Sequence, residues 1–353
     1  MPILITGGAG YIGTHTCVEL LQSGYEIIVV DNFSNSKREA LRSVACITGK
    51  EFPVYEVDLL DKDPLARVFA ENKIEAVIHF AGLKAVGESV SMPLRYYQNN
   101  IIGMLNLCEV METFGVYRLV FSSSATVYGM SEDVPFHEEL PIQATNPYGR
   151  TKQMCEQLLQ DLYRANREWS ITLLRYFNPI GAHSSGLIGE EPNGIPNNLL
   201  PFISQVASGK ISELKIYGND YPTHDGTGIR DYIHVMDLAM GHVKALDKVF
   251  KGSGLETYNL GTGKGYSVLD IVHAFEKAAE KQIPYQIVER RAGDIAISYA
   301  DSTKAKRELN WTAERGIDEM CRDSWRFQMK NPKGYHACED EDSFFSTNIR
   351  QNS

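Results

Sequence analysis

The chain has 353 residues, 43% of them hydrophobic and 23% charged, with a formal net charge of −10 and a pI near 5.5. This composition is typical of a globular protein with a sizeable core, and the length leaves room for about two domains. The acidic balance argues against nucleic acid or an anionic membrane surface as a partner.

The six cysteines are scattered and the nine histidines form no cluster with metal-ligand spacing. We therefore expect no metal site and no disulfide framework, which suits a reducing compartment. The opening residues, MPILITGG, lack the basic start and the apolar run of a signal peptide. No stretch approaches the ~20 apolar residues of a membrane span. The sequence favours a cytoplasmic protein with no membrane partner.

The first half of the chain alternates short apolar runs with helical patterns. The runs predict strands at 3–6, 26–31, 75–82, 118–125 and 170–178. The segment IGTHTCVELLQSG has helical periodicity and ends at Gly24, a C-cap residue. Strands that alternate with helices in this way predict an α/β fold, a Rossmann-type doubly wound parallel sheet.

The composition of the chain changes after residue 178. The segment up to 201 is rich in Gly, Pro and Asn and predicts a long loop of the kind that is usually functional. Short strands and helices follow, such as LKIYG and DIVHAFEKAAE, and predict a smaller C-terminal α/β cap. We expect a Rossmann domain at 1–178, to which some later segments return, a second domain at 179–335, and a polar, disordered tail at 336–353.

A glycine-rich turn, ITGGAGYIGTH, follows the first strand and places Gly7, Gly10 and Gly13 three residues apart. Glycines at this spacing let the backbone approach a pyrophosphate, and the next helix offers its N-terminus to the phosphates. Asp31 ends the second strand, where a carboxylate can bind the adenosine ribose hydroxyls and would repel a 2′-phosphate. A plain loop and a plain turn residue would also explain these features separately. Together they predict an NAD site.

The segment NPYGRTK places Tyr148 and Lys152 one helical turn apart, behind Asn146 as a cap and Pro147 at the first helical position. An ammonium nearby favours the phenolate and lowers the pKa of a tyrosine from its usual value near ~10. Ser124 ends the fourth strand at the edge where such sheets bind ligands. Such pairs also arise by chance, but in this context they predict proton handling for carbinol–carbonyl redox chemistry.

At this point the sequence resembles the extended short-chain dehydrogenase/reductases and, among them, the UDP-galactose 4-epimerases. The resemblance covers residues 1 to about 335 and rests on GGAGYIG, VVDNFSNSK, HFAGLKAVGESV, SSSATVYG, NPYGRTK, LRYFNPIGAH, PNNLLPF, YGNDYPTHDGTGIRDYIHV and RRAGD. Several of these blocks are typical of the epimerases rather than of the wider superfamily.

The resemblance implies an enzyme that keeps its NAD and inverts carbon 4 of UDP-galactose or UDP-glucose. Tyr148 would remove the 4-hydroxyl proton with Ser124 as shuttle, NAD would remove the hydride, and the 4-keto sugar would swing about its pyrophosphate. Lys152 would lower the pKa of Tyr148 and hold the nicotinamide ribose. A homodimer built from two helices per subunit is also implied.

The matching motifs also imply binding positions. NAD contacts would come, besides the glycines and the trio, from Tyr11, Ile12, Asp31, Asn32, Asn35, Ser36, Asp58, Leu59, Phe80, Ala81, Gly82, Lys84, Asn99 and Phe177. UDP-sugar contacts would come from Lys84, Ser124, Tyr148, Asn178, Asn198, Leu199, Tyr217, Arg230, Arg291, Asp294 and Ser298. A net-acidic protein needs fixed cations to hold a pyrophosphate, which agrees with the two arginines, although each alone would more often form a surface ion pair.

The chain departs from the family pattern at one position. Some bacterial members carry a tyrosine four residues past the position of Asp294, where this chain has Ser298. The smaller side chain would open space for a 2-acetamido group, so we expect activity on UDP-N-acetylgalactosamine and UDP-N-acetylglucosamine as well. The adjacent Tyr299 could instead fill that space.

Three other functions compete with this interpretation. A nucleotide-sugar 4,6-dehydratase shares the fold, but its elimination step calls for an acid pair where this chain has Ala125 and Thr126. An NADP-linked reductase is opposed by Asp31. A non-catalytic NAD sensor would have no need for Ser124, Tyr148 and Lys152 together. We expect His79, His183 and His234 to be structural.

Overall fold

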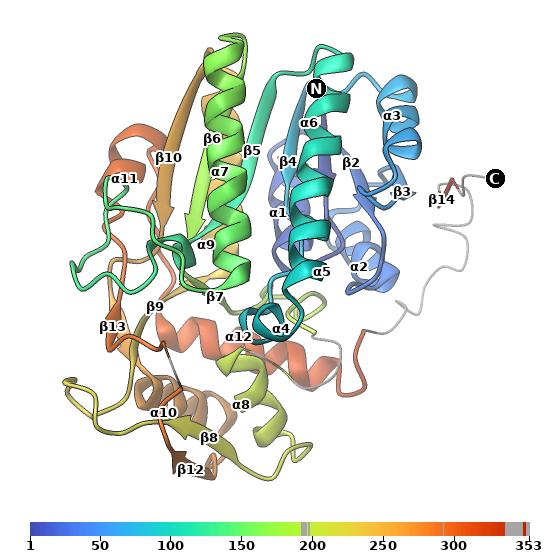
Figure 1. Ribbon diagram of the computed structural model, residues 1–353. Helices are drawn as coiled ribbons and strands as arrows, with labels where there is room; N and C mark the ends of the chain where they lie inside the picture. The colour runs from blue at the N-terminus through green and yellow to red at the C-terminus, as the bar shows by residue number, and fades with distance from the viewer. Residues whose placement is uncertain (192–195, 197, 292, 336–348, 351–353) are drawn as a thin grey trace.

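The computed structural model describes residues 1–191, 196, 198–291 and 293–335, together with the backbone of 349–350. Most of the tail predicted at 336–353, including Cys338, lies outside the described residues. Figure 1 shows a large sheet flanked by helices above a smaller lobe. This arrangement confirms the predicted Rossmann-type fold with a smaller α/β cap.

The large sheet is parallel throughout, with β1 at its centre. Its strands, in spatial order, are β10 (Gly254–Leu260), β6 (Ser170–Tyr176), β5 (Arg118–Ser124), β4 (Ala76–His79), β1 (Pro2–Thr6), β2 (Glu26–Asp31), β3 (Val54–Glu56) and β14 (Ile349–Arg350). Strand order reverses between β1 and β4, and a crevice at such a switch point is where doubly wound sheets bind ligands.

Helices bury both faces of this sheet. One face is covered by α1 (Tyr11–Gln22), α2 (Arg38–Thr48), α9 (Val235–Val249) and α11 (Thr303–Leu309). The other is covered by α3 (Lys62–Glu71), α6 (Gly103–Thr113) and α7 (Pro147–Ala165), the last two in front of the sheet in Figure 1. Burial on both faces explains why the strands read as continuous apolar runs.

Strand β5 ends one residue earlier than its apolar run predicts, and two other strands end two or more residues earlier. Strand β4 stops at His79 because the amides of Phe80 and Ala81 both donate to the carbonyl of Thr6, at 3.0 and 3.1 Å. Strand β6 stops at Tyr176, and the chain then changes sheets. The next strand, β7 (Asn178–Ile180), pairs with the smaller lobe.

The smaller lobe has its own core and two small sheets. In one sheet β9 (Ile229–His234) lies between β11 (Gly265–Ser267) and β13 (Ile297–Ser298), and β7 also pairs with β9; the other sheet joins β8 (Leu214–Tyr217) to β12 (Tyr285–Val288). Three helices pack on them: α8 (Leu199–Ala207), α10 (Val268–Ala279) and α12 (Ile317–Lys330).

Four short elements connect the crevice to the outer helices, namely α4 (Val86–Ser91), α5 (Pro93–Tyr97), the π-helical turn η1 (Gln98–Ile102) and the 3₁₀ turn η2 (Ala125–Tyr128). Within the described residues, no helix combines the length and the apolar character needed to cross a bilayer.

Among the described residues, His15, His79 and His242 are buried in the large domain. Burial lowers the pKa of His15 to about 3, of His79 to about 3, where the charge of Lys152 adds to the effect, and of His242 to about 4. All three are therefore neutral in the folded protein at any pH near neutrality.

We predict that acid destabilises the fold from pH ~6.5 downward. Because the folded-state pKa values lie below the unfolded value of ~6.5, the unfolded chain binds protons first, at about 1.4 kcal/mol per pH unit for each histidine. Urea unfolding at several pH values between 7 and 5 measures this slope. At each pH the free energy of unfolding is extrapolated to water, because it falls roughly linearly with urea concentration. His79→Gln should flatten it by one histidine's share, whereas His273→Gln, at an exposed position, should not. A flat wild-type profile would contradict the assignment.

Candidate functional site

The glycine turn packs too tightly for side chains. A Cβ on Gly7, whose φ is +69°, would lie 2.6 Å from the amide nitrogen of Ala81, and a Cβ on Gly13 would lie 2.5 Å from the carbonyl oxygen of Gly7. Gly10 is the N-cap of α1 and supplies no side-chain cap. The amides that open α1 are thus available to an anion, and the turn fits the pyrophosphate of a dinucleotide.

Asp31 ties the glycine turn to the loop after β2. Its carboxylate accepts hydrogen bonds from the Ala9 amide at 3.0 Å, the Phe33 amide at 2.9 Å and the Ser36 hydroxyl at 2.8 Å. Burial raises the pKa of Asp31 and these hydrogen bonds lower it. A carboxylate has about four acceptor positions, so it keeps capacity for a ribose hydroxyl.

The other predicted dinucleotide residues line the same edge of the sheet. Asn32 donates to Asp58 at 2.8 Å, which joins the loops after β2 and β3, and Asn35 lies exposed in the turn that follows. Tyr11 donates through its hydroxyl to Gly181 at 2.7 Å. The remaining members are Ile12 and Leu59 in or against the two cores, Phe80, Ala81 and Gly82 after β4, Asn99 in η1 and Phe177 after β6.

The predicted helix cap is confirmed. Asn146 accepts the Gly149 amide at 2.9 Å, and Pro147 begins α7. Tyr148 and Lys152 are both buried on the inner face of α7. The Lys152 ammonium donates to the carbonyl of Ser122 at 2.6 Å, so it is directed at β5. That it lowers the pKa of Tyr148 stays a prediction.

Ser124 ends β5 beside the phenol. Burial raises the pKa of Tyr148, and a hydrogen bond with Ser124 lowers it. The Ser124 oxygen also accepts from Thr126, from its hydroxyl at 2.9 Å and its amide at 3.2 Å. Thr126 therefore orients Ser124, a role that the sequence analysis missed. The only sequence feature that could have indicated this role is the position of Thr126 two residues after the end of a strand, where hydroxyl residues favour turns.

Glu190 is a second residue that the sequence analysis missed. Its carboxylate accepts from the ammonium of Lys84 at 2.9 Å and from the side-chain amide of Asn198 at 2.7 Å. Both partners had been predicted as ligand contacts, and the structure brings them together on one acid. Because Lys84 and Glu190 are 106 positions apart, no sequence spacing could reveal the contact.

The predicted sugar-nucleotide residues of the smaller lobe form one cluster. Asp294 accepts from Arg291 at 2.9 Å and lies 3.8 Å from the guanidinium of Arg230. Arg291 also covers the exposed ring of Tyr217, at 4.8 Å from its centroid. Ser298 is buried and pairs in register with Arg230. Two cations and an aromatic face suit a nucleoside diphosphate.

Asn178 and Leu199 lie at the boundary of the two lobes. Asn178 begins β7 with its side chain exposed, and Leu199 begins α8. Asn178 is thus on the strand that takes the chain from the large sheet to β9, and Leu199 is on a helix that packs in the smaller lobe.

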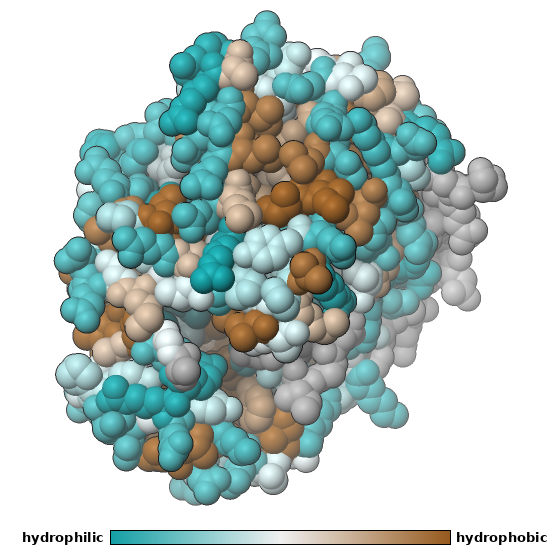
Figure 2. Space-filling view, viewed as in Figure 1, coloured by the Kyte–Doolittle hydropathy of each residue, from teal (hydrophilic) through white to brown (hydrophobic). Residues whose placement is uncertain are grey.

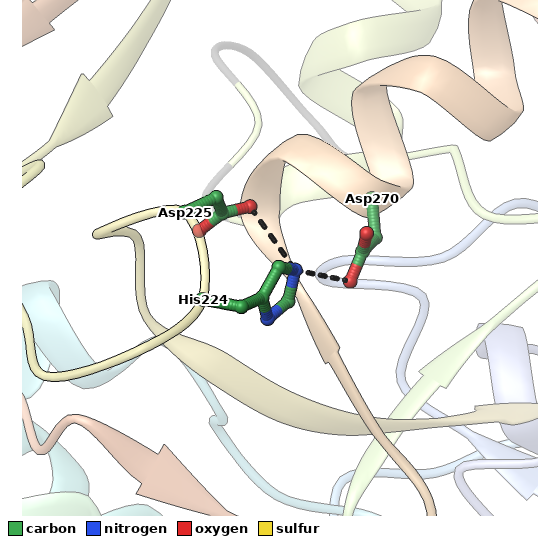
Figure 3. A group of neighbouring side chains, drawn as sticks. All are labelled: His224, Asp225 and Asp270. Atoms are coloured by element: carbon green, nitrogen blue, oxygen red, sulfur yellow. Dashed lines mark ion pairs between the residues drawn. The ribbon is translucent and has the colours of Figure 1, made fainter.

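A separate group, His224, Asp225 and Asp270, places its ligand atoms within 4.8 Å of one another (Figure 3). Asp225 accepts from Thr227 and from Ser267, and Asp270 accepts the Ser267 amide at 2.9 Å in the capping box of α10. These hydrogen bonds account for the arrangement of both carboxylates, and His224 is exposed. We assign no metal to the group.

Comparison with known proteins agrees with this geometry. Residues 4–324 match the family model described as GDP-mannose 4,6 dehydratase. The chain is 64% identical over 339 residues to the UDP-glucose 4-epimerase of Bacillus subtilis, covering 96% of this chain and all of that protein. The chain belongs to the UDP-glucose 4-epimerase family.

Solved structures of this isomerase family superpose closely. The UDP-glucose 4-epimerase of Bifidobacterium longum in complex with NAD+ and UDP has a TM-score of 0.92 at 54% identity, covering 95% of this chain and all of that one. The Stenotrophomonas maltophila enzyme, with bound NAD and formylated UDP-arabinopyranose, has a TM-score of 0.92 at 49% identity, covering 94% and 98%.

We predict that Gly13→Ala destabilises the protein, because the new Cβ would contact the backbone of Gly7 and Gly8 below 3 Å. Overpacking of this kind costs about 1–3 kcal/mol, although alanine is otherwise favoured over glycine in a helix. Urea unfolding measures the loss. Gly87→Ala in α4 is the matched control, since its Cβ would meet nothing within 4 Å. Equal stability of the two variants would contradict the packing account.

Proposed function

We propose that the chain interconverts UDP-galactose and UDP-glucose by inverting carbon 4, with Tyr148 as the base. The observation that carries this proposal is the burial of Tyr148 and Lys152 at the end of β5, where Ser124 hydrogen-bonds the phenol and the Ser122 carbonyl accepts from the ammonium. The glycine turn that fits a dinucleotide follows β1 in the same parallel sheet. The arginine cluster of the smaller lobe supports a substrate that carries a nucleoside diphosphate. We also propose that residues 179–335 mainly bind this UDP-sugar.

NAD would be held by the glycine turn, Asp31, the loops after β2 to β4, and Lys152. When bound, it would supply the oxidising and reducing chemistry by accepting a hydride from carbon 4, which leaves a 4-keto sugar, and returning it to the opposite face. The Asp31 carboxylate can bind the 2′-hydroxyl of the adenosine ribose and would repel a 2′-phosphate, which favours NAD over NADP. Two related structures contain NAD.

The protein's own part is to move the hydroxyl proton. Tyr148 would take the proton of the 4-hydroxyl through Ser124 and give it back to the same oxygen at the end of the cycle. Burial keeps the phenol protonated, so the hydrogen bond from Ser124 and the positive charge of Lys152 are needed to favour the phenolate. Thr126 holds Ser124 in place for the relay.

The substrate's pyrophosphate would compete with Asp294 for Arg230 and Arg291. A guanidinium can donate two hydrogen bonds to two oxygens of one phosphate. A partly exposed ion pair with Asp294 contributes little free energy, so a phosphate can replace the carboxylate. Tyr217 and Asn198 would contact the uridine side, and Lys84 would turn from Glu190 to the sugar. The dehydratase alternative is opposed by Ala125 and Thr126, which occupy the acid-pair positions in η2.

We propose that the sugar pocket also accepts 2-acetamido sugars. Ser298 is buried and small, and the adjacent Tyr299 turns the other way: its ring approaches the position of Gly265, 3.8 Å from an added Cβ. Successive residues of an extended segment point to opposite sides. Tyr299 is thus directed toward β11 rather than into the space beside Ser298.

A homodimer is the expected assembly. Figure 2 shows apolar side chains gathered over the run from α5 through η1 to α6 and over α7, and exposed apolar residues of these elements are Leu94, Ile102, Leu105 and Met154. An exposed apolar patch on paired helices is typical of a subunit interface. A cytoplasmic location and the absence of nucleic-acid binding stay predictions.

Tyr148→Phe should lower kcat by about 10²- to 10⁴-fold, because it removes the proton acceptor and keeps the ring. The assay is the conversion of UDP-galactose by purified protein without added NAD, followed by proton NMR. Tyr163→Phe, at a half-buried position near the C-terminal end of α7, is the control and should keep full activity. Failure of the wild type, even with NAD added, would contradict the proposed function.

Ser298→Tyr should reduce turnover of UDP-N-acetylgalactosamine at least about 10-fold more than turnover of UDP-galactose, because the phenol would fill the acetamido space. Ser298→Ala is the control and should act on both sugars. A wild type that turns over UDP-galactose but leaves the acetylated sugar untouched would refute the open pocket.

Leu105→Glu should convert a dimer to a monomer, because it places a charge in the apolar interface. Sedimentation velocity measures the change. Ile287→Glu, on the exposed side of β12, is the control. If the wild type sediments as a monomer, the patch is not a dimer interface.

A further inference from the structure

An ion pair is buried behind the proton-handling trio. Glu156 on α7 is fully buried and Arg175 on β6 is 3% exposed. The contact is bidentate: the Nε of Arg175 donates to Oε1 at 3.0 Å and its Nη2 to Oε2 at 2.7 Å. Ser123 on β5 donates to the same Oε1 at 2.5 Å. One carboxylate thus joins a helix to two neighbouring strands.

The helix and one of the two strands carry the proton-handling residues. Glu156 lies one helical turn after Lys152 and two after Tyr148, on the same buried face of α7. Ser123 directly precedes Ser124 at the end of β5. In Figure 1 α7 crosses in front of β5 and β6, so the pair lies between the helix and the strands it must be aligned with.

The guanidinium extends the connection to the turn after β5. Its Nη1 donates to the Tyr128 hydroxyl at 3.0 Å and to the Glu138 carbonyl at 3.1 Å. Tyr128, in η2, donates in turn to Asn259 on β10 at 2.7 Å. The network is therefore satisfied at both ends and fixes η2, which also contains Thr126, the residue that orients Ser124.

Stability alone does not explain this pair. Two charges brought out of water lose so much hydration that apolar residues of similar size are often equally stable. What a bidentate pair adds is a fixed geometry. We propose that the pair of Glu156 and Arg175 is the positioning unit that holds the proton-handling side chains of α7 and β5 in register. The inference rests on the function proposed above.

The charge of Glu156 also acts on Lys152. Burial lowers the pKa of Lys152 to about 8, while Cys155 and Glu156 on the same helix raise it. The other titratable groups that face this region are His79 on β4 and Tyr176 on β6, both neutral near pH 7. Burial raises the pKa of Cys155 to about 12, so its thiol is neutral near pH 7, and Glu156 is the one anion among the described groups that act on the ammonium.

Glu156→Gln keeps the size and removes the charge. It should lower kcat about 10- to 100-fold with little change in KM, since displacement of reacting groups by ~1 Å can cost as much. It should also move the alkaline limb of the kcat–pH profile to lower pH, because Lys152 then loses its proton more readily. NMR titration of lysine-labelled protein, with Lys152 assigned from its loss in Lys152→Arg, measures that shift without reference to activity.

Two further variants separate positioning from folding. Glu156→Met/Arg175→Met should fold and retain bound NAD but keep a kcat reduced by about 10-fold or more. Ser123→Ala leaves the ion pair intact but removes its hydrogen bond to β5. It should lower kcat about 10-fold while the pKa of Lys152 stays unchanged. Thr172→Val, at a buried hydroxyl on β6 outside the network, is the control and should change neither.

Wild-type kcat in the double variant or in Ser123→Ala would overturn the proposal, and so would an unshifted Lys152 titration in Glu156→Gln. A Glu156→Gln variant too unstable to purify leaves the decision to the other two. If the wild-type enzyme does not turn over UDP-galactose, the proposed function fails, whereas the Lys152 titration still tests the action of Glu156 on the site.

Discussion

The proposed function depends on one buried phenol, Tyr148, which would have to exchange a proton near neutral pH. Burial raises its pKa, so the fold would have to bring to it groups that favour the phenolate. A parallel sheet does this because the carboxyl ends of all its strands meet at one edge. Ser124 at the end of β5 and Lys152 on α7 come together there, although Lys152 is itself buried and its own pKa is lowered to about 8.

Features set by local sequence could be predicted before the structure. The Asn146–Pro147 helix start, the glycine turn and the strand-end position of Asp31 depend on neighbours within a few residues, and all three are found. Features set by contacts across the chain could not. Glu190 meets Lys84 from a distant loop, β7 leaves the large sheet for β9, and Ser122 takes the Lys152 ammonium. The burial of Glu156 could have been predicted, because an acid at i+4 from Lys152 and i+8 from Tyr148 lies on the same face of the helix as they do.

An acidic chain that binds an acidic substrate, as we propose for this one, would have to hold its cations ready without neutralising them permanently. Here each cation is engaged by a carboxylate on a partly exposed surface: Arg291 and Arg230 by Asp294, and Lys84 by Glu190. Such pairs are weak and exchangeable. The contrast with the fully buried pair of Glu156 and Arg175 is informative, because that pair is placed where exchange would disturb the alignment of α7.

We propose that this protein moves only the hydroxyl proton, and that the hydrogen on carbon 4 never exchanges with solvent. The direct test is to run the conversion of UDP-galactose in D₂O and examine carbon 4 of the UDP-glucose formed by NMR. Ordinary hydrogen at that carbon after many turnovers is the expected result. Deuterium at carbon 4 would mean that a proton is removed from carbon itself, and would contradict the role given to Tyr148.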